Sequence, residues 1–288
     1  MIEVKDLHFT YQGNREQTIK GLEFRIKKGE VFGFLGPSGA GKSTTQKILL
    51  GILKGYSGSI EVFGRNLKEL RSDYYERVGV SFEFPNLYSK LTARENLDFF
   101  ASLYSGETED PLKLLTMVGL EDSIDIRVSK FSKGMKMRLN FCRALLNNPE
   151  VLFLDEPTAG LDPANARRIK DIIFDLKRQG KTVFVTTHNM NVAEEVCDRI
   201  AFIVEGKLSL IDAPASMMMD RSRNIVRVEY GNNGRVGAEE FSLEKLGENS
   251  GFINLLKTQT IRTIHSQEAD LEDIFIEVTG FSLTGKEE

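Results

Sequence analysis

Residues 36–43 read Gly36-Pro37-Ser38-Gly39-Ala40-Gly41-Lys42-Ser43 and match the pattern G-x-x-x-x-G-K-[ST] without a mismatch. Glycines let the backbone turn tightly and approach oxygen atoms that a Cβ atom would keep away. The N–H groups of such a loop, with the N-terminus of the next helix, form a concave anion site. We expect these eight residues and Thr44 to bind a nucleotide, with Lys42 on its β- and γ-phosphates and Ser43 on Mg²⁺.

The surroundings of this loop support that interpretation. An apolar strand is expected over residues 31–35 and a helix over residues 42–53, with apolar residues at three- and four-residue spacing on one helix face. The alternative is a glycine-rich turn without a ligand. A phosphate loop requires a strand before it and a helix after it, and this chain has both.

An acidic pair follows a second apolar strand. Residues 151–154 read Val-Leu-Phe-Leu and are followed by Asp155 and Glu156. A carboxylate at the end of such a strand is placed to hold the Mg²⁺ shell, which we expect of Asp155. The next carboxylate, Glu156, can polarise the attacking water as general base. Alone, the pair would read as exposed acids after a strand, but the phosphate loop upstream favours the catalytic role.

A third strand, residues 182–186, delivers His188 to the same place. Ligands of open α/β sheets bind at the carboxyl ends of the strands, so His188 is a candidate to contact the γ-phosphate and orient water. His8 and His265 have no comparable context.

The order of elements predicts an α/β fold. The first 35 residues read as β structure, residues 95–104 and 133–146 as helices, and short strands then alternate with helices up to residue 211. This predicts a mixed, mainly parallel sheet with an N-terminal antiparallel part. We expect one domain over residues 1–215, with a helical subdomain at about 88–148, and a small α+β accessory domain over residues 216–288.

Charge and hydropathy limit the possible partners. The chain has 38 basic and 42 acidic residues and a net charge of −4, which argues against nucleic-acid binding. No apolar run approaches the ~20 residues that cross a bilayer. If the protein acts at a membrane, another chain is expected to cross it.

Taken in this order, the motifs resemble the ATPases of ABC transporters, closely over residues 1–215 and weakly over 216–288. The resemblance gives Tyr11 the role of the aromatic that stacks on adenine. It places Ser132 and Gly134 in the signature sequence before a helix, and Asp162 in the D-loop. Glu83 falls at the position of the Q-loop glutamine, where a carboxylate can still ligate Mg²⁺.

Two departures from the family pattern concern the signature and the Q-loop. The usual LSGGQ reads Phe131-Ser132-Lys133-Gly134-Met135 here, which keeps the serine and the second glycine. Glu83 adds negative charge near the γ-phosphate, where the family pattern has an uncharged amide.

The resemblance implies a P-loop NTPase fold of ABC type that binds ATP and Mg²⁺. It also implies a head-to-tail pair of ATPase domains, from a homodimer or a related chain. ATP on one phosphate loop would be capped by Ser132 and Gly134 of the other chain. The pair would drive a separately encoded transmembrane permease from the cytoplasmic face of the membrane, as a peripheral subunit. The segment 131–138 and the residues Leu271-Glu272-Asp273-Ile274-Phe275 look most like exporters of drugs, small molecules or lipids.

Two alternatives remain at this point. A soluble ABC ATPase acting on ribosomes or nucleic acid would usually carry paired ATPase domains or long coiled-coil insertions, and this chain shows one phosphate loop and no heptad tract. A catalytically dead regulatory module would fit Glu83 and Met135, but not the presence of Lys42, Glu156 and His188.

Overall fold

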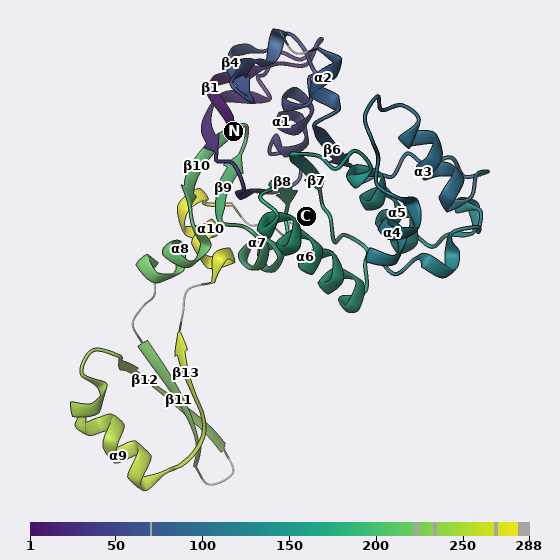
Figure 1. Ribbon diagram of the computed structural model, residues 1–288. Coiled ribbons are helices and arrows are strands. Elements are labelled where there is room, and N and C mark those ends of the chain that lie inside the picture. Colours follow the sequence, from purple (N-terminus) through teal and green to yellow (C-terminus); the bar gives the residue numbers. More distant parts are fainter. Residues whose placement is uncertain (70, 222–224, 233–234, 268–269, 282–288) are drawn as a thin grey trace. The chain divides into compact units, whose positions relative to one another are not determined.

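The computed structural model describes residues 1–69, 71–221, 225–232, 235–267 and 270–281 (Figure 1). The chain divides into two compact units, Met1–Ala213 and Pro214–Gly280. Each unit is described by itself below. No helix among the described residues combines the length and apolar character of a membrane span.

The first unit contains two β-sheets. The antiparallel sheet has the order β2-β1-β4-β5, with the bounds β1 (Ile2–Phe9), β2 (Ile19–Ile26), β4 (Ser57–Val62) and β5 (Arg65–Asn66). The larger sheet has the order β10-β9-β3-β8-β7-β6. Its strands are β3 (Val31–Leu35), β6 (Val78–Ser81), β7 (Val151–Asp155), β8 (Thr182–Thr187), β9 (Arg199–Val204) and β10 (Lys207–Asp212). Five of these strands run parallel to one another, and β10 pairs antiparallel with β9.

The larger sheet is buried because its strands are apolar on both faces. Strands β3, β7 and β8 are buried along their whole length. Phe32, Phe34, Phe153 and Phe184 pack on one another, with ring centroids 5.0–6.5 Å apart. They belong to a core shared with the antiparallel sheet and with α1 (Lys42–Leu49). Continuous apolar runs of this kind are typical of parallel strands covered on both sides.

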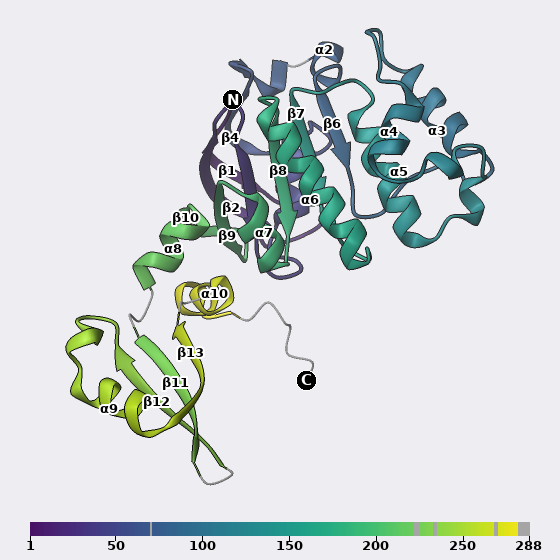
Figure 2. The same ribbon diagram turned by 60° about the horizontal axis from the view of Figure 1, so that its bottom comes forward.

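Helices cover the rest of the larger sheet. Helices α6 (Pro163–Arg178) and α7 (Met190–Val196) contact its central strands (Figure 2). A helical region packs beside β6 through α5 (Lys133–Leu145). It also contains α3 (Ala93–Ala101) and α4 (Pro111–Met117), while α2 (Ser72–Tyr75) precedes β6. The remaining single turns of this unit are 3-10 helices at Leu67–Glu69, Glu121–Ser123 and Val128–Lys130.

Helix α1 is shorter than the sequence predicts. It ends at Leu49, whereas the apolar spacing predicts a helix to residue 53. Gly51 lies in the left-handed region with φ 69°, and its N–H donates to Ile48 O. A glycine in this conformation ends helices, which the apolar periodicity alone does not show.

The second unit is a small α+β unit. Its sheet has the antiparallel order β12-β11-β13, made of β11 (Ile225–Asn232), β12 (Arg235–Ser242) and β13 (Thr260–Gln267). Val226 and Val228 form a small core with Leu255 of α9 (Ser250–Thr258). Helices α8 (Pro214–Arg221) and α10 (Leu271–Thr279) contact each other, and a 3-10 turn spans Leu246–Glu248.

Candidate nucleotide site

The strands β3, β6, β7 and β8 are parallel, so their carboxyl ends meet at one edge of the sheet. A cavity of about 370 Å³ lies there. It is lined by Ser38, Gly39, Gly41, Lys42, Ser43, Thr44, Glu83, Asp155, Glu156 and His188. All ten are residues for which the sequence predicts a role in the site.

The loop after β3 needs its glycines for steric reasons. A Cβ atom on Gly36 would lie 2.0 Å from the carbonyl oxygen of Ile203 in β9. Gly41, which precedes α1, has a φ of 111°, and a Cβ there would lie 2.8 Å from Cδ1 of Ile19. The loop can therefore adopt this close-packed turn only with glycine at both positions.

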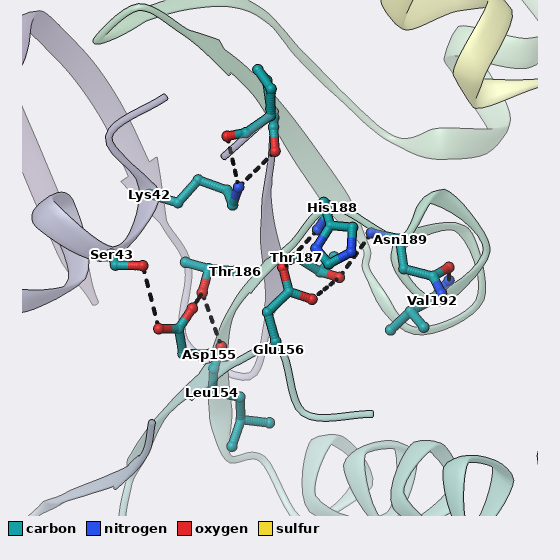
Figure 3. A network of polar contacts seen from close by, with 12 residues as sticks. Lys42, Ser43, Leu154, Asp155, Glu156, Thr186, Thr187, His188, Asn189 and Val192 are labelled. Carbon is teal, nitrogen blue, oxygen red and sulfur yellow. Dashed lines mark hydrogen bonds and ion pairs between the residues drawn. The ribbon is translucent and has the colours of Figure 1, made fainter. Parts of the chain in front are cut away.

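Lys42 is the first residue of α1 and is 9% exposed. Its Nζ atom donates to the carbonyl oxygens of Gly36 (2.6 Å) and Pro37 (3.0 Å) (Figure 3). Burial lowers the pKa of the Lys42 ammonium, and the carboxylates of Glu156 and Asp155 oppose that shift. A buried positive charge held inside the loop is suited to bind phosphate.

Ser43 and Asp155 face each other across the cavity. Ser43 Oγ donates to Oδ2 of Asp155 at 3.3 Å, and Asp155 is 7% exposed at the end of β7. A hydroxyl and a carboxylate oxygen are the hard ligands that Mg²⁺ takes when phosphates and water supply the others. The described residues contain no cluster of three or more His, Cys, Asp or Glu that would hold a metal ion by itself. The pair fits Mg²⁺ only together with a nucleotide.

Glu156 has an unusual backbone conformation. Its φ is +49°, a left-handed value that is uncommon for residues other than glycine. Its N–H donates to Thr186 O at 2.9 Å, and the residue is 7% exposed. Its Oε1 atom accepts from the backbone N–H of His188 (2.9 Å) and lies 2.7 Å from His188 Nδ1. Backbone strain of this kind tends to occur at functional sites.

The other predicted nucleotide-binding residues do not line the cavity. Tyr11 contacts a cavity residue instead, since its hydroxyl is 3.1 Å from Thr44 Oγ1. The carbonyl oxygens of Gly36 and Pro37 accept from Lys42 Nζ, and the N–H of Ala40 donates to Pro37 O within the loop.

The predicted signature and D-loop residues lie at the starts of two helices. Ser132 caps α5 by accepting from Met135 N, and Gly134 lies beside the loop that contains Leu161. Asp162 caps α6, and hydrogen bonds from the backbone and side chain of Asn165 lower its pKa.

The sequence analysis missed Thr186 and Thr187 at the end of β8. Both are buried, and each hydroxyl donates to one of the two carboxylates at the end of β7 (Figure 3). The sequence does contain a signal for them, because two polar residues at the end of an apolar strand are typical of a site at the sheet edge. Their partners, however, depend on which strand lies next to β8.

The fold and the cavity define a nucleotide-binding P-loop ATPase. A family model described as "ABC transporter" matches residues 19–159, and one described as "Fluoroquinolone efflux ABC transporter C-terminal domain" matches residues 224–268. The chain belongs to the ATP-binding proteins of ABC transporters, and it is an ATPase. The expected family, fold class and function are thereby confirmed, in preference to a soluble ATPase acting on ribosomes or nucleic acid.

The relatives cover between about three quarters and nearly all of the chain. A fluoroquinolones export ATP-binding protein of Mycobacterium tuberculosis is 53% identical over 99% of this chain and 95% of its own length. A bacitracin transport ATP-binding protein of Bacillus licheniformis is 36% identical over 81% of this chain and 76% of its own length. Among solved structures, a dimeric ATP-binding cassette bound to ADP and phosphate matches with a TM-score of 0.68 and 30% identity. That match covers 74% of this chain and 98% of the cassette.

Proposed function

We propose that this ATPase powers export of a small amphipathic drug, with fluoroquinolones as the first candidates, through a separate membrane subunit. The proposal rests on the relative that is 53% identical and named for fluoroquinolone export. The match of residues 224–268 to a C-terminal domain named for the same efflux supports it independently of the ATPase motifs.

The cavity supports a specific division of roles. Lys42 would hold the β- and γ-phosphates of ATP, and Tyr11 would stack on adenine. Ser43, Asp155 and Glu83 would hold Mg²⁺, which neutralises charge on the phosphates when it is bound. Glu156 would accept a proton from the attacking water. His188, with both ring nitrogens protonated, would donate a hydrogen bond from Nε2 to the γ-phosphate.

The proposed ATPase unit is a head-to-tail dimer. Within one chain Ser132, Gly134 and Asp162 do not line the cavity, whereas they belong to loops that pack together. In a head-to-tail pair these residues would instead cap the nucleotide of the partner subunit. A related cassette, solved as a dimer with bound ADP and phosphate, supports the pairing of two such domains.

An exposed apolar face gives the membrane subunit a place to dock. A groove of about 420 Å³ is lined by aromatic and aliphatic side chains that include Tyr75, Phe100 and Leu103. Phe84, 74% exposed, directly follows Glu83 of the nucleotide cavity. Exposed apolar surface of this kind is typical of interaction sites. The chain would then lie at the cytoplasmic face of the membrane, and residues 216–288 would support the dimer or regulate it.

Glu156→Gln tests the catalytic assignment. The variant should bind ATP with near-normal affinity and lose turnover by about 10²–10⁴-fold, because the general base is removed. Glu194→Gln, on the exposed surface of α7, is the matched control and should hydrolyse ATP normally. Normal hydrolysis by Glu156→Gln would remove Glu156 from the mechanism. In cells that also contain the membrane subunit, the same variant should lose resistance to fluoroquinolones.

A further inference from the structure

Strand β8 ends in two buried threonines whose hydroxyls serve two different carboxylates. Thr186 is 0% exposed and Thr187 is 1% exposed. Thr186 Oγ1 donates to Oδ1 of Asp155, and Thr187 Oγ1 donates to Oε2 of Glu156 at 2.9 Å (Figure 3). Two consecutive residues of one strand thus bind two consecutive residues of its neighbour.

The backbone of β7 explains how both contacts form at once. Asp155 lies opposite Thr186 in the parallel pairing of β7 with β8. Successive side chains of a strand point to opposite faces, so a regular continuation would send Glu156 away from Asp155. Thr186 and Thr187 alternate in the same way, so the parallel register that sets Asp155 beside Thr186 also sets Glu156 beside Thr187. The hydrogen bond from Glu156 N–H to Thr186 O continues the strand pairing at this point.

The hydroxyl of Thr187 has a defined direction. The backbone N–H of Asn189 donates to Thr187 Oγ1 at 3.0 Å, so the oxygen is the acceptor in that bond. An ionised carboxylate only accepts, so the hydroxyl proton points to Glu156 Oε2. Because His188 N–H binds Oε1, both oxygens of Glu156 are engaged and the plane of the carboxylate is fixed.

We propose that Thr187 is a positioning residue for Glu156 and that Thr186 is the corresponding residue for Asp155. Neither threonine is among the described residues that line the cavity, so each acts through its carboxylate. The inference rests on the proposed roles of Glu156 as general base and of Asp155 as a holder of Mg²⁺. It goes beyond those roles because it assigns the orientation of the Glu156 carboxylate to the Thr187 hydroxyl and that of the Asp155 carboxylate to the Thr186 hydroxyl. Catalytic geometry generally needs such support from buried hydrogen bonds.

Substituting the two threonines should therefore change different kinetic properties of the ATPase. Thr187→Val in the full-length chain should lower kcat for ATP by about 10–100-fold while KM and the Mg²⁺ requirement stay within about twofold. Thr186→Val should instead raise the Mg²⁺ concentration for half-maximal activity by about 10-fold or more. It should also weaken Mn²⁺ binding in the presence of a non-hydrolysable ATP analogue, read by electron paramagnetic resonance. Identical changes in the two variants would overturn the division of roles.

Strand β8 itself supplies the matched control. Thr182 is also 0% exposed, but its hydroxyl accepts from the backbone N–H of Gly29 at 2.9 Å and makes no hydrogen bond to a carboxylate of the described residues. Thr182→Val should keep both kcat and the metal requirement. If it lost turnover like Thr187→Val, packing of the strand would explain the effect and the proposal would be wrong.

Two further substitutions of Thr187 distinguish the effect of losing its hydroxyl from the effect of losing its methyl group. Thr187→Ser should retain near-normal kcat because it keeps the donor. If Thr187→Val does not fold, Thr187→Ala takes its place. Equal losses in Thr187→Ser and Thr187→Ala would contradict the proposal.

A double variant distinguishes this inference from the proposed function. In the Glu156→Gln background, Thr187→Val should cause no further loss of the residual turnover, since the group it positions is gone. An active Glu156→Gln variant would refute the proposed role of Glu156. An inactive Glu156→Gln variant combined with normal turnover in Thr187→Val would refute only the positioning role.

Discussion

His188 Nδ1 lies 2.7 Å from Oε1 of Glu156, across the ends of β8 and β7. A carboxylate oxygen can only accept when ionised, so Nδ1 carries the proton of this hydrogen bond. The other ring nitrogen, Nε2, accepts in the neutral ring and donates to a phosphate oxygen only in the doubly protonated ring. The His188 side chain is 62% exposed. His188 therefore both restrains Glu156 and presents a nitrogen at the cavity.

Replacing His188 by alanine should remove both contributions. Turnover should fall by at least about 10²-fold, the effect of losing one donor to a transition-state oxygen. ATP affinity, measured by isothermal titration calorimetry, should change by less than about threefold, because Lys42 and the loop N–H groups remain.

His265→Ala is the matched control for this experiment. His265 lies in β13, in the other compact unit, and should be dispensable for hydrolysis. A His188→Ala variant that hydrolyses ATP as fast as His265→Ala would show that the contact with Glu156 is structural.

The buried charge of Lys42 predicts a pH dependence of ATP binding. Burial lowers the pKa of Lys42 from 10.5, and phosphate in the complex would raise it again. Binding then takes up a proton at any pH between the two values, so ATP affinity should fall as the pH rises through the lowered pKa. Titrations from about pH 8 upward, where the phosphates are already ionised, should show this decline. An affinity that rises with pH would contradict it.

The same shift predicts the opposite trend for stability of the ligand-free chain. A lysine whose pKa is lower when folded destabilises the protein while it is charged. That penalty is relieved as the pH rises from the lowered pKa toward 10.5. The difference in Tm between wild type and Lys42→Ala, measured by calorimetry, should therefore move in favour of the wild type over this range. A constant difference would mean that the Lys42 ammonium is not desolvated.

Much of the site follows from local sequence and one topological rule. The phosphate loop, Asp155, Glu156 and His188 each follow an apolar strand, and parallel strands bring their carboxyl ends together. That rule suffices to place residues at one edge of the sheet. It does not give strand order, because the order β3-β8-β7-β6 differs from the order along the chain.

The contacts of Thr186 and Thr187 depend on strand order and register, which the sequence alone does not show. Thr187 contacts Glu156 because β8 lies beside β7 and because the register of the two strands sets Asp155 opposite Thr186, which makes the next two residues neighbours. Neither fact can be predicted from hydrophobic periodicity, because periodicity indicates which residues are buried but not which strand lies next to which. The early end of α1 has a different origin, because Gly51 is a helix-ending signal that stands in the sequence, whereas the apolar spacing continues past it.

Glu83 allows a test of the departure in the Q-loop. This exposed carboxylate lines the same cavity as Asp155, so it adds a charged ligand where an amide is usual. Glu83→Gln should weaken Mn²⁺ binding to the complex with an ATP analogue several-fold, because carboxylates bind hard cations more strongly than amides. Glu61→Gln, on the exposed side of β4, is the control. Unchanged Mn²⁺ affinity in Glu83→Gln would exclude Glu83 from the metal shell.

Mixing two inactive variants tests the head-to-tail dimer. Lys42→Ala should fail to bind ATP on its own loop but keep an intact Ser132 for its partner. Ser132→Arg should bind ATP but fail to cap the partner's nucleotide. In a mixed dimer the two lesions fall on the same site and leave the other site intact. Half of the randomly formed dimers are mixed, so the mixture should recover about a quarter of wild-type hydrolysis if the sites act independently. If Ser132 served the nucleotide of its own chain, every site in the mixture would carry one lesion and no activity would return.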